Sequence, residues 1–169
     1  MRAVFYLGVF SLAVTGAAHA NWQFTSWGQS LESLLAAEGH RFRRLSDEEA
    51  RDHAIPALRG VPLLEGEYTT PDISTILRVF FAEDGLSGVH LELKSADDAI
   101  IALGRLKAQY GVPASEMERF RNGCQEMRYG WMDHLNGNSV SFSFSSCDTG
   151  FQNHLILYSP VLSAGQTGL

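Results

Sequence analysis

The chain has 169 residues, of which 45% are hydrophobic and 19% are charged, and its net charge is −6. This composition excludes a disordered chain, because it supplies enough apolar side chains for a buried core. The acidic balance argues against nucleic acid as a partner and against an anionic membrane surface, since both require a basic face.

The first twenty residues predict a secretory signal peptide over residues 1–20. Met1 and Arg2 form a short basic start, residues 3–17 carry no charge, and Ala18-His19-Ala20 places small residues around a cleavage point. The apolar run is too short to span ~30 Å of hydrocarbon, which takes ~20 residues. We expect a periplasmic or secreted mature chain without a transmembrane anchor. An uncleaved anchor helix is the alternative.

Two short helices are expected near the start of the mature chain. Ser30 suits the N-cap of a helix over residues 31–37, and Gly39 suits its end. The segment Ser46-Asp47-Glu48-Glu49 has the spacing of a capping box, which predicts a second helix that ends before Pro56.

Residues 64–70, 73–82 and 88–93 alternate between apolar and polar side chains or are rich in strand-forming residues, which predicts three strands. Glu83-Asp84-Gly85 suits a three-residue hairpin loop between the second and the third strand. The resulting register places five apolar side chains on one face: Leu77, Val79, Phe81, Val89 and Leu91.

A longer helix is expected after the N-cap residue Ser95, with Ala99, Leu103, Leu106 and Tyr110 on its apolar face. Gly111 and Pro113 predict its end. We expect residues 115–120 to add a further helical turn.

The last third predicts strands near residues 124–131, 139–145 and 152–159, followed by a flexible tail over residues 160–169. If residues 134–137 form a four-residue loop, the register sets Trp131 against Val140 and Cys124 directly opposite Cys147. Opposed strand residues lie close enough for a bridge after modest adjustment. We therefore expect a Cys124–Cys147 disulfide, as an even cysteine count in an exported chain also indicates.

The order of these elements predicts the fold class. Strands and helices in the order α-βββ-α-βββ favour an α+β fold, with an antiparallel sheet of about six strands and helices packed on one face. Residues 21–159 are expected to form a single domain. The sequence does not decide whether the two three-strand halves are related copies.

Short motifs occur in a fixed order: Trp27-Gly28-x-Ser30 before a helix, an Asp-Gly-Leu hairpin, Tyr110-Gly111-x-Pro113 after Leu106, and a tryptophan in the next strand. In this order the chain resembles a group of small, mostly uncharacterised bacterial envelope proteins, over Trp27 to Tyr158. Leu31 departs from the acidic residue or proline expected after Ser30. The resemblance implies an envelope location and this fold, and no catalytic residues.

Two kinds of reactive site have candidate residues in the sequence. His90 and Glu92 share a strand face and, with His154, are the only candidate metal ligands, but a metal site needs three or four converging ligands. Gly85-Leu86-Ser87-Gly88 lacks the last glycine of a nucleophile elbow. We expect no cofactor and no metal. A small secreted hydrolase with dispersed Ser, His and Asp residues is the alternative to a non-catalytic protein, and a metal-binding protein is a weaker alternative.

One polar strip is the candidate binding surface. It comprises the alternating serines of one strand and two charged residues opposite them: Ser139, Ser141, Ser143, Ser145, Arg128 and Glu126. The simplest interpretation is a solvated sheet face, and the functional one is a surface that binds an envelope protein or a glycan. The aromatic residues Trp22, Phe24 and Trp27 leave the same choice between packing and partner contact. We expect a non-catalytic binding or accessory protein of the bacterial envelope.

Overall fold

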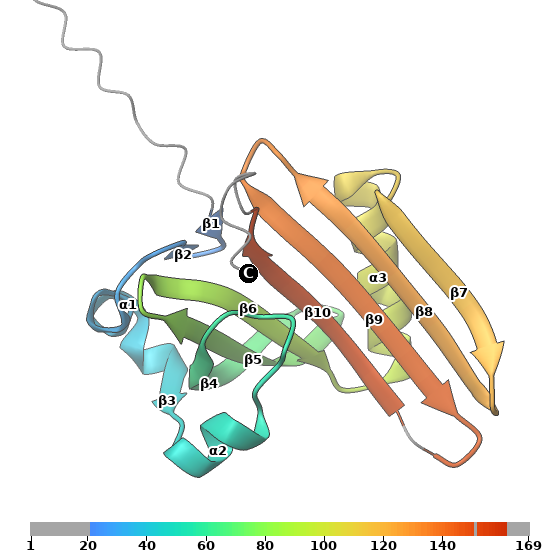
Figure 1. Cartoon of the computed structure of the whole chain (residues 1–169), viewed down its shortest axis with the longest axis horizontal. Coiled ribbons are helices and arrows are strands. Elements are labelled where there is room, and N and C mark those ends of the chain that lie inside the picture. Colours follow the sequence, from blue (N-terminus) through green and yellow to red (C-terminus); the bar gives the residue numbers. More distant parts are fainter. Residues whose placement is uncertain (1–20, 151, 162–169) are drawn as a thin grey trace, which may run out of the picture.

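A computed structural model describes residues 21–150 and 152–161. The predicted signal peptide and residues 162–169 of the predicted tail lie outside these ranges. The main element is an antiparallel sheet of eight strands in the order β3-β4-β5-β6-β10-β9-β8-β7 (Figure 1). Its strands are β3 (Phe42–Arg44), β4 (Val61–Thr70), β5 (Ile73–Ala82), β6 (Gly85–Leu93), β7 (Ser115–Arg121), β8 (Cys124–Asp133), β9 (Asn138–Cys147) and β10 (Gln152–Pro160).

The remaining elements are short, with one exception. A small hairpin of β1 (Asn21–Trp22) and β2 (Thr25–Ser26) precedes the sheet. The helices are α1 (Leu31–Glu38), the 3₁₀ turn η1 (Gly39–Arg41), α2 (Asp47–Asp52) and the longer α3 (Ala96–Tyr110). The predicted α+β class therefore holds.

The predicted number of strands was wrong, because the main sheet has eight strands and not six. The two additional strands lie at its edges, β3 at one end and β7 at the other. Residues 115–120, expected as a helical turn, instead belong to β7, which pairs with β8 along its whole length. Charged residues occupy both faces of β7, because solvent reaches both sides of this edge strand. The sequence therefore lacks the alternation of apolar and polar residues that identifies a half-buried strand.

The sheet has an inner face, covered by α1, α3 and the β1–β2 hairpin, and an outer face on the other side. The main core lies on the inner face, where Leu34 of α1 and Leu106 of α3 belong to one cluster with Val79 and Phe142 of the sheet. The outer face is also covered in part, by a segment that is not helical. The segment that follows α2 crosses the outer face, where Leu58 packs in a second cluster with two residues of the sheet, Phe80 and Leu157.

The helix ends agree with the capping residues. The Ser30 side chain accepts a hydrogen bond from the Ser33 amide at the start of α1. Ser46 and Glu49 form the complete capping box of α2. Ser95 caps α3, and Gly111, with φ of 73°, ends it in a conformation that favours glycine.

Both predicted hairpin registers are confirmed. In β8 and β9, Trp131 lies opposite Val140 and Cys124 lies opposite Cys147, and a disulfide joins the two cysteines. In β5 and β6, Leu77 lies opposite Leu91, although the connecting turn is shorter than expected. A bulge near Ser87 absorbs the difference, so the apolar residues keep their common face.

Among residues 21–150 and 152–161, no helix has the length and apolar composition that crossing a bilayer requires.

Reducing the disulfide is expected to lower the free energy of unfolding by about 3 kcal/mol. The bridge joins residues 23 positions apart and restricts the unfolded chain, and a loop of this length stabilises by about that amount. Urea unfolding with and without reductant measures the difference. The double variant C124S/C147S should have the stability of the reduced protein, and reductant should not change it. Equal stability of the oxidised and the reduced protein would contradict the prediction.

Candidate functional site

One row of directly opposed residues crosses the outer face through all eight strands. Its first half is charged or titratable and its second half is small or apolar. From β3 to β7 the row runs Arg43, Glu65, Arg78, His90, Leu157, Ser141, Gly130 and Ser115. The outer face therefore divides into an ionic half over β3–β6 and a hydroxyl-rich half over β7–β10.

The ionic half is organised around Arg78. Its Nε donates to Glu65 Oε2 at 2.8 Å, and its Nη1 donates to Glu92 Oε2 at 2.6 Å. The Arg78 side chain is only 6% exposed, whereas Glu92 is 45% exposed. A buried guanidinium needs such partners, because an unpaired buried charge costs several kcal/mol.

Glu65 extends the network to the sheet edge. Arg43 of β3 donates to Glu65 at 2.6 Å and to Glu49 of α2 at 2.8 Å. Burial by itself raises the pKa of Glu65, but the hydrogen bond from Arg43 and the charge of Arg78 outweigh it and leave that pKa below its usual value. This network ties α2 to the sheet, which is a structural role.

His90 is the buried neighbour of this network. It is 6% exposed, and neither of its ring nitrogens has a hydrogen-bond partner among the described residues. Burial, with the positive charges of Arg78 and His53, lowers its pKa to about 4, although Glu92 acts in the opposite direction. His90 is therefore a neutral imidazole at pH 7.

The hydroxyl-rich half contains an open groove with a volume of about 360 Å³. Ala57, from the segment that crosses the outer face, lies on one side of it, and Ser115 and Met117 of β7 lie on the other. Gly130 keeps this space open, since a Cβ at that position would lie 2.6 Å from the Ser115 Oγ. The groove adjoins the predicted polar strip, and it includes Ser141, Ser143 and Arg128 together with the aliphatic residues Leu155 and Leu157.

The predicted polar strip is a continuous surface. Arg128 lies opposite Ser143 and Glu126 lies opposite Ser145, so both charges share the face of the four alternating serines Ser139, Ser141, Ser143 and Ser145. Arg119 of β7 pairs with Glu126 at 2.6 Å. Arg128 is exposed and forms no ion pair with any residue that the structure describes. The strip therefore presents an available cation beside a row of hydroxyl groups.

The three candidate metal ligands do not meet. His90 and Glu92 lie on the outer face, whereas His154 lies on the inner face and stacks on Phe144 with 4.7 Å between ring centroids. Within the described ranges, no group of three His, Cys, Asp or Glu residues could hold a metal ion. The Ser87 hydroxyl donates to the carbonyl oxygen of Arg59 at 2.7 Å, which gives this serine a structural role.

The N-terminal aromatic residues pack against the molecule. Trp22 is 5% exposed, and Phe24 and Trp27 are partly buried against the main core. The Trp27 indole donates to Asn138 Oδ1 at 2.8 Å and so connects the N-terminal segment to β9. These residues therefore pack against the main core.

No family model, curated protein or solved structure matches the chain. The residues behind the resemblance to envelope proteins have structural roles here: Ser30 caps α1, Gly111 ends α3, and Trp131 is buried and donates to the Gly111 carbonyl. Membership of that group remains a prediction, and function is inferred from the chain's own residues.

Sequence reasoning missed the Arg78 network and the groove. A signal for the network was present, because Glu65, Arg78 and Glu92 each interrupt a strand at a position facing away from the apolar residues. The groove had no such signal. The groove depends on Ala57 and on β7. Local sequence pattern predicts neither the path of the segment that carries Ala57 nor the strand conformation of β7.

Replacing Arg78 with alanine is expected to lower the free energy of unfolding by about 3 kcal/mol, because it removes a guanidinium that is only 6% exposed and takes one of two arginine partners from Glu65, whose side chain is 16% exposed. Arg43→Ala is the matched control in the same row. Its side chain is 52% exposed, so a loss below about 1 kcal/mol is expected. Urea unfolding at pH 7 measures the free energy of unfolding of both variants. Equal losses of stability would show that the contribution of each arginine does not depend on its burial.

Lowering the pH from about 6.5 to about 4 is expected to destabilise the protein through His90. The unfolded chain takes up the proton near pH 6.5, whereas the folded chain resists it until about pH 4, so the free energy of unfolding falls as the pH falls through this window. One such group contributes a slope of about 1 kcal/mol per pH unit. Burial also lowers the pKa of His154, which adds in the same direction.

Urea unfolding of His90→Gln across this pH range should therefore give a flatter dependence than the wild type. The exposed His134→Gln variant is the matched control. A wild-type slope in His90→Gln would contradict the assignment.

Proposed function

We propose that this chain is an exported, non-catalytic binding or accessory protein of the bacterial envelope. The observation that carries the proposal is the open groove on the outer face. There Arg128, exposed and without an ion-pair partner in the described part of the chain, adjoins serine hydroxyls and an aliphatic floor. The Cys124–Cys147 disulfide supports export, because such bonds persist in oxidising compartments.

The groove chemistry favours a polypeptide as the ligand. Ser141 and Ser143 can donate to or accept from backbone amides, and Leu155 and Leu157 offer apolar contact to side chains. Arg128 adds a charge-assisted hydrogen bond to a carboxylate. We therefore propose an extended segment of an envelope protein with an acidic residue, and a glycan is the alternative ligand.

A hydrolytic function has less support. Ser87 is bonded to a backbone carbonyl, His90 is buried beside Arg78, and His154 lies on the opposite face from both. These positions do not bring a serine nucleophile to a free imidazole.

Blocking the groove is expected to abolish partner binding. Ser141→Trp fills the floor and should remove binding, and Arg128→Gln should weaken it about tenfold, which corresponds to ~1.4 kcal/mol. Arg121→Gln is the matched control, because Arg121 is an exposed arginine at the end of β7 outside the groove lining. Proteins that the wild type captures from an envelope extract are identified and purified. Each is then titrated against the wild type and the three variants.

If the wild type and Ser141→Trp bound the partner with equal affinity, the groove could not be the binding site. Binding of an envelope glycan in place of a protein would correct the ligand class. Turnover of an ester, peptide or glycoside by the purified protein would exclude a purely non-catalytic role.

A further inference from the structure

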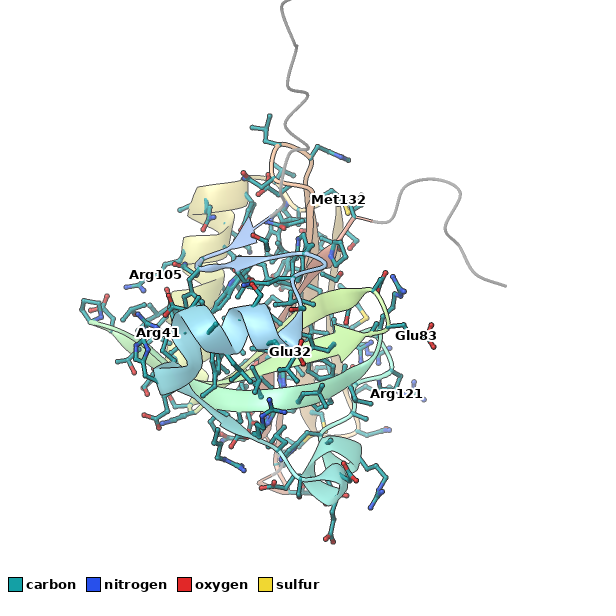
Figure 2. All side chains as sticks on the ribbon, turned by 90° about the vertical axis from the view of Figure 1, so that its left-hand side faces the viewer. Glu32, Arg41, Glu83, Arg105, Arg121 and Met132 are labelled. Atoms are coloured by element: carbon teal, nitrogen blue, oxygen red, sulfur yellow. A yellow bond between two sulfur atoms is a disulfide. The ribbon has the colours of Figure 1, made fainter. Side chains whose placement is uncertain are left out.

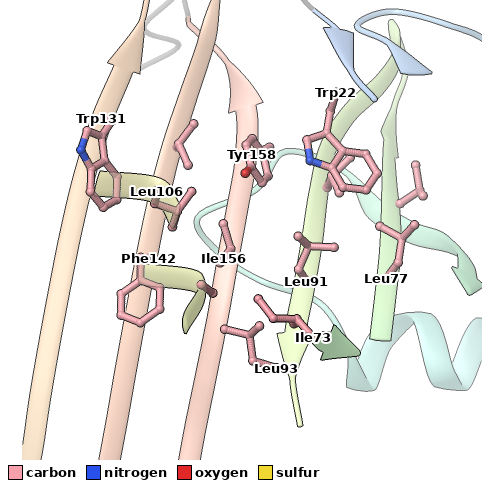
Figure 3. Packing of buried hydrophobic residues seen from close by; sticks show 14 of the residues in the cluster. Trp22, Ile73, Leu77, Leu91, Leu93, Leu106, Trp131, Phe142, Ile156 and Tyr158 are labelled. Carbon is pink, nitrogen blue, oxygen red and sulfur yellow. The ribbon is translucent and has the colours of Figure 1, made fainter. Parts of the chain in front are cut away.

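A second, smaller hollow lies on the inner face between the β1–β2 hairpin and α3. Its volume is about 140 Å³. Strands β5, β6 and β10 form its floor, α3 forms one wall, and Trp22 covers it. Figure 3 shows Trp22 above Leu91, with Tyr158 and Ile156 on the neighbouring strand and Leu106 on the α3 side.

The lining is mainly apolar and aromatic. Trp22 packs against Tyr68 with 5.4 Å between ring centroids and against Tyr158 with 5.9 Å. Two hydroxyl groups of this lining already have partners: the Thr75 hydroxyl donates to the Tyr68 carbonyl at 3.1 Å, and the Thr70 hydroxyl accepts from Arg105 at 3.0 Å. A water molecule inside would find few open partners, so the hollow favours an apolar occupant.

The volume sets the size of that occupant. An apolar cavity of about 150 Å³ in a protein core holds one benzene molecule. A hollow of about 140 Å³ therefore matches one six-membered ring.

The rim sets the charge of the occupant. Arg105 of α3, labelled in Figure 2, donates to the Thr70 hydroxyl at 3.0 Å and pairs with Asp72. Because Asp72 already balances this cation, the rim offers little net attraction to an anion. Gln109 adds an amide at the same mouth. A neutral ring with one hydroxyl group matches this combination of dry interior and polar rim.

The cover is held by a strained turn. Gln23, which follows Trp22 and joins the lining, has φ of 52°, a conformation that residues other than glycine rarely adopt. The two-residue strand β1 pairs Trp22 with β2, and the Thr25 hydroxyl donates to the Trp22 carbonyl at 2.7 Å. We expect a ligand to enter by displacing this short hairpin, which leaves the main sheet intact.

We infer that this hollow is a binding site for a neutral molecule of one-ring size, such as a simple phenol. The inference rests on the inner face and is independent of the groove on the outer face.

The test titrates the full folded protein with phenol, followed by calorimetry and by the chemical shifts of the Leu and Ile methyl groups. We expect saturable binding with a dissociation constant of roughly 0.1–1 mM, which is modest for a ligand of seven heavy atoms. Shifts should concentrate at Leu91, Leu106 and Ile156 and spare Leu58, which lies on the outer face. Benzoate should bind at least tenfold more weakly.

Ala102→Leu fills the hollow from α3 and should weaken phenol binding at least tenfold, while the midpoint of urea unfolding is maintained or raised. Ala108→Leu makes the same change at an exposed position of α3 and should leave binding unchanged. If Ala102→Leu fails to fold, Ile156→Phe fills the hollow from the floor. Absence of saturable binding by the wild type, or wild-type affinity in the filled variant, would overturn the inference.

Discussion

Pairing between β6 and β10 joins two groups of strands that are each built from sequence neighbours. Strands β3–β6 follow one another along one part of the sheet, and β7–β10 do the same along the other, so within each group the pairing is local. The ladder between the groups joins residues far apart in the sequence, with four opposed pairs from Leu155–Glu92 to Tyr158–Val89. Closing it costs more chain entropy than closing a hairpin. Helix α3, which connects the groups and packs across β5, β6, β10, β9 and β8, supplies the buried contacts that offset this cost.

Both proposed sites adjoin this seam, one on each face. On the outer face, His90 of β6 and Leu157 of β10 lie opposite each other and mark the change from ionic to hydroxyl-rich surface. On the inner face, Leu91 and Ile156 are the next opposed pair, and they form part of the floor of the small hollow. A change in the twist between β6 and β10 would reach both sites, because the two pairs are consecutive residues on the same strands.

Local patterns predicted much of this arrangement and failed where the path of the chain is set by distant packing. Opposed apolar residues predicted the β8–β9 register, and the cysteines agreed with it independently, so the disulfide followed. Ser30, Ser46 and Ser95 marked three helix starts, because each hydroxyl caps a backbone within three residues of itself. Strand β7 was missed because an edge strand carries no one-sided pattern. The polar strip was predicted as a shared face, but its groove depends on Ala57, which tertiary packing alone brings beside Leu157.

Among the residues that the structure describes, no strand pairs with the outer edge of β3 or of β7. The composition of these two edges bears on how the protein behaves when it is concentrated. Exposed backbone amides and carbonyls on β3 and β7 are templates on which another copy could add a strand and begin a fibril. Four of the seven residues of β7 are charged, and two of the three residues of β3 are arginines. These charges must be desolvated or opposed before two edges can join. Salt screens surface charges beyond a Debye length of ~8 Å at physiological ionic strength, so aggregation should become easier as the ionic strength rises.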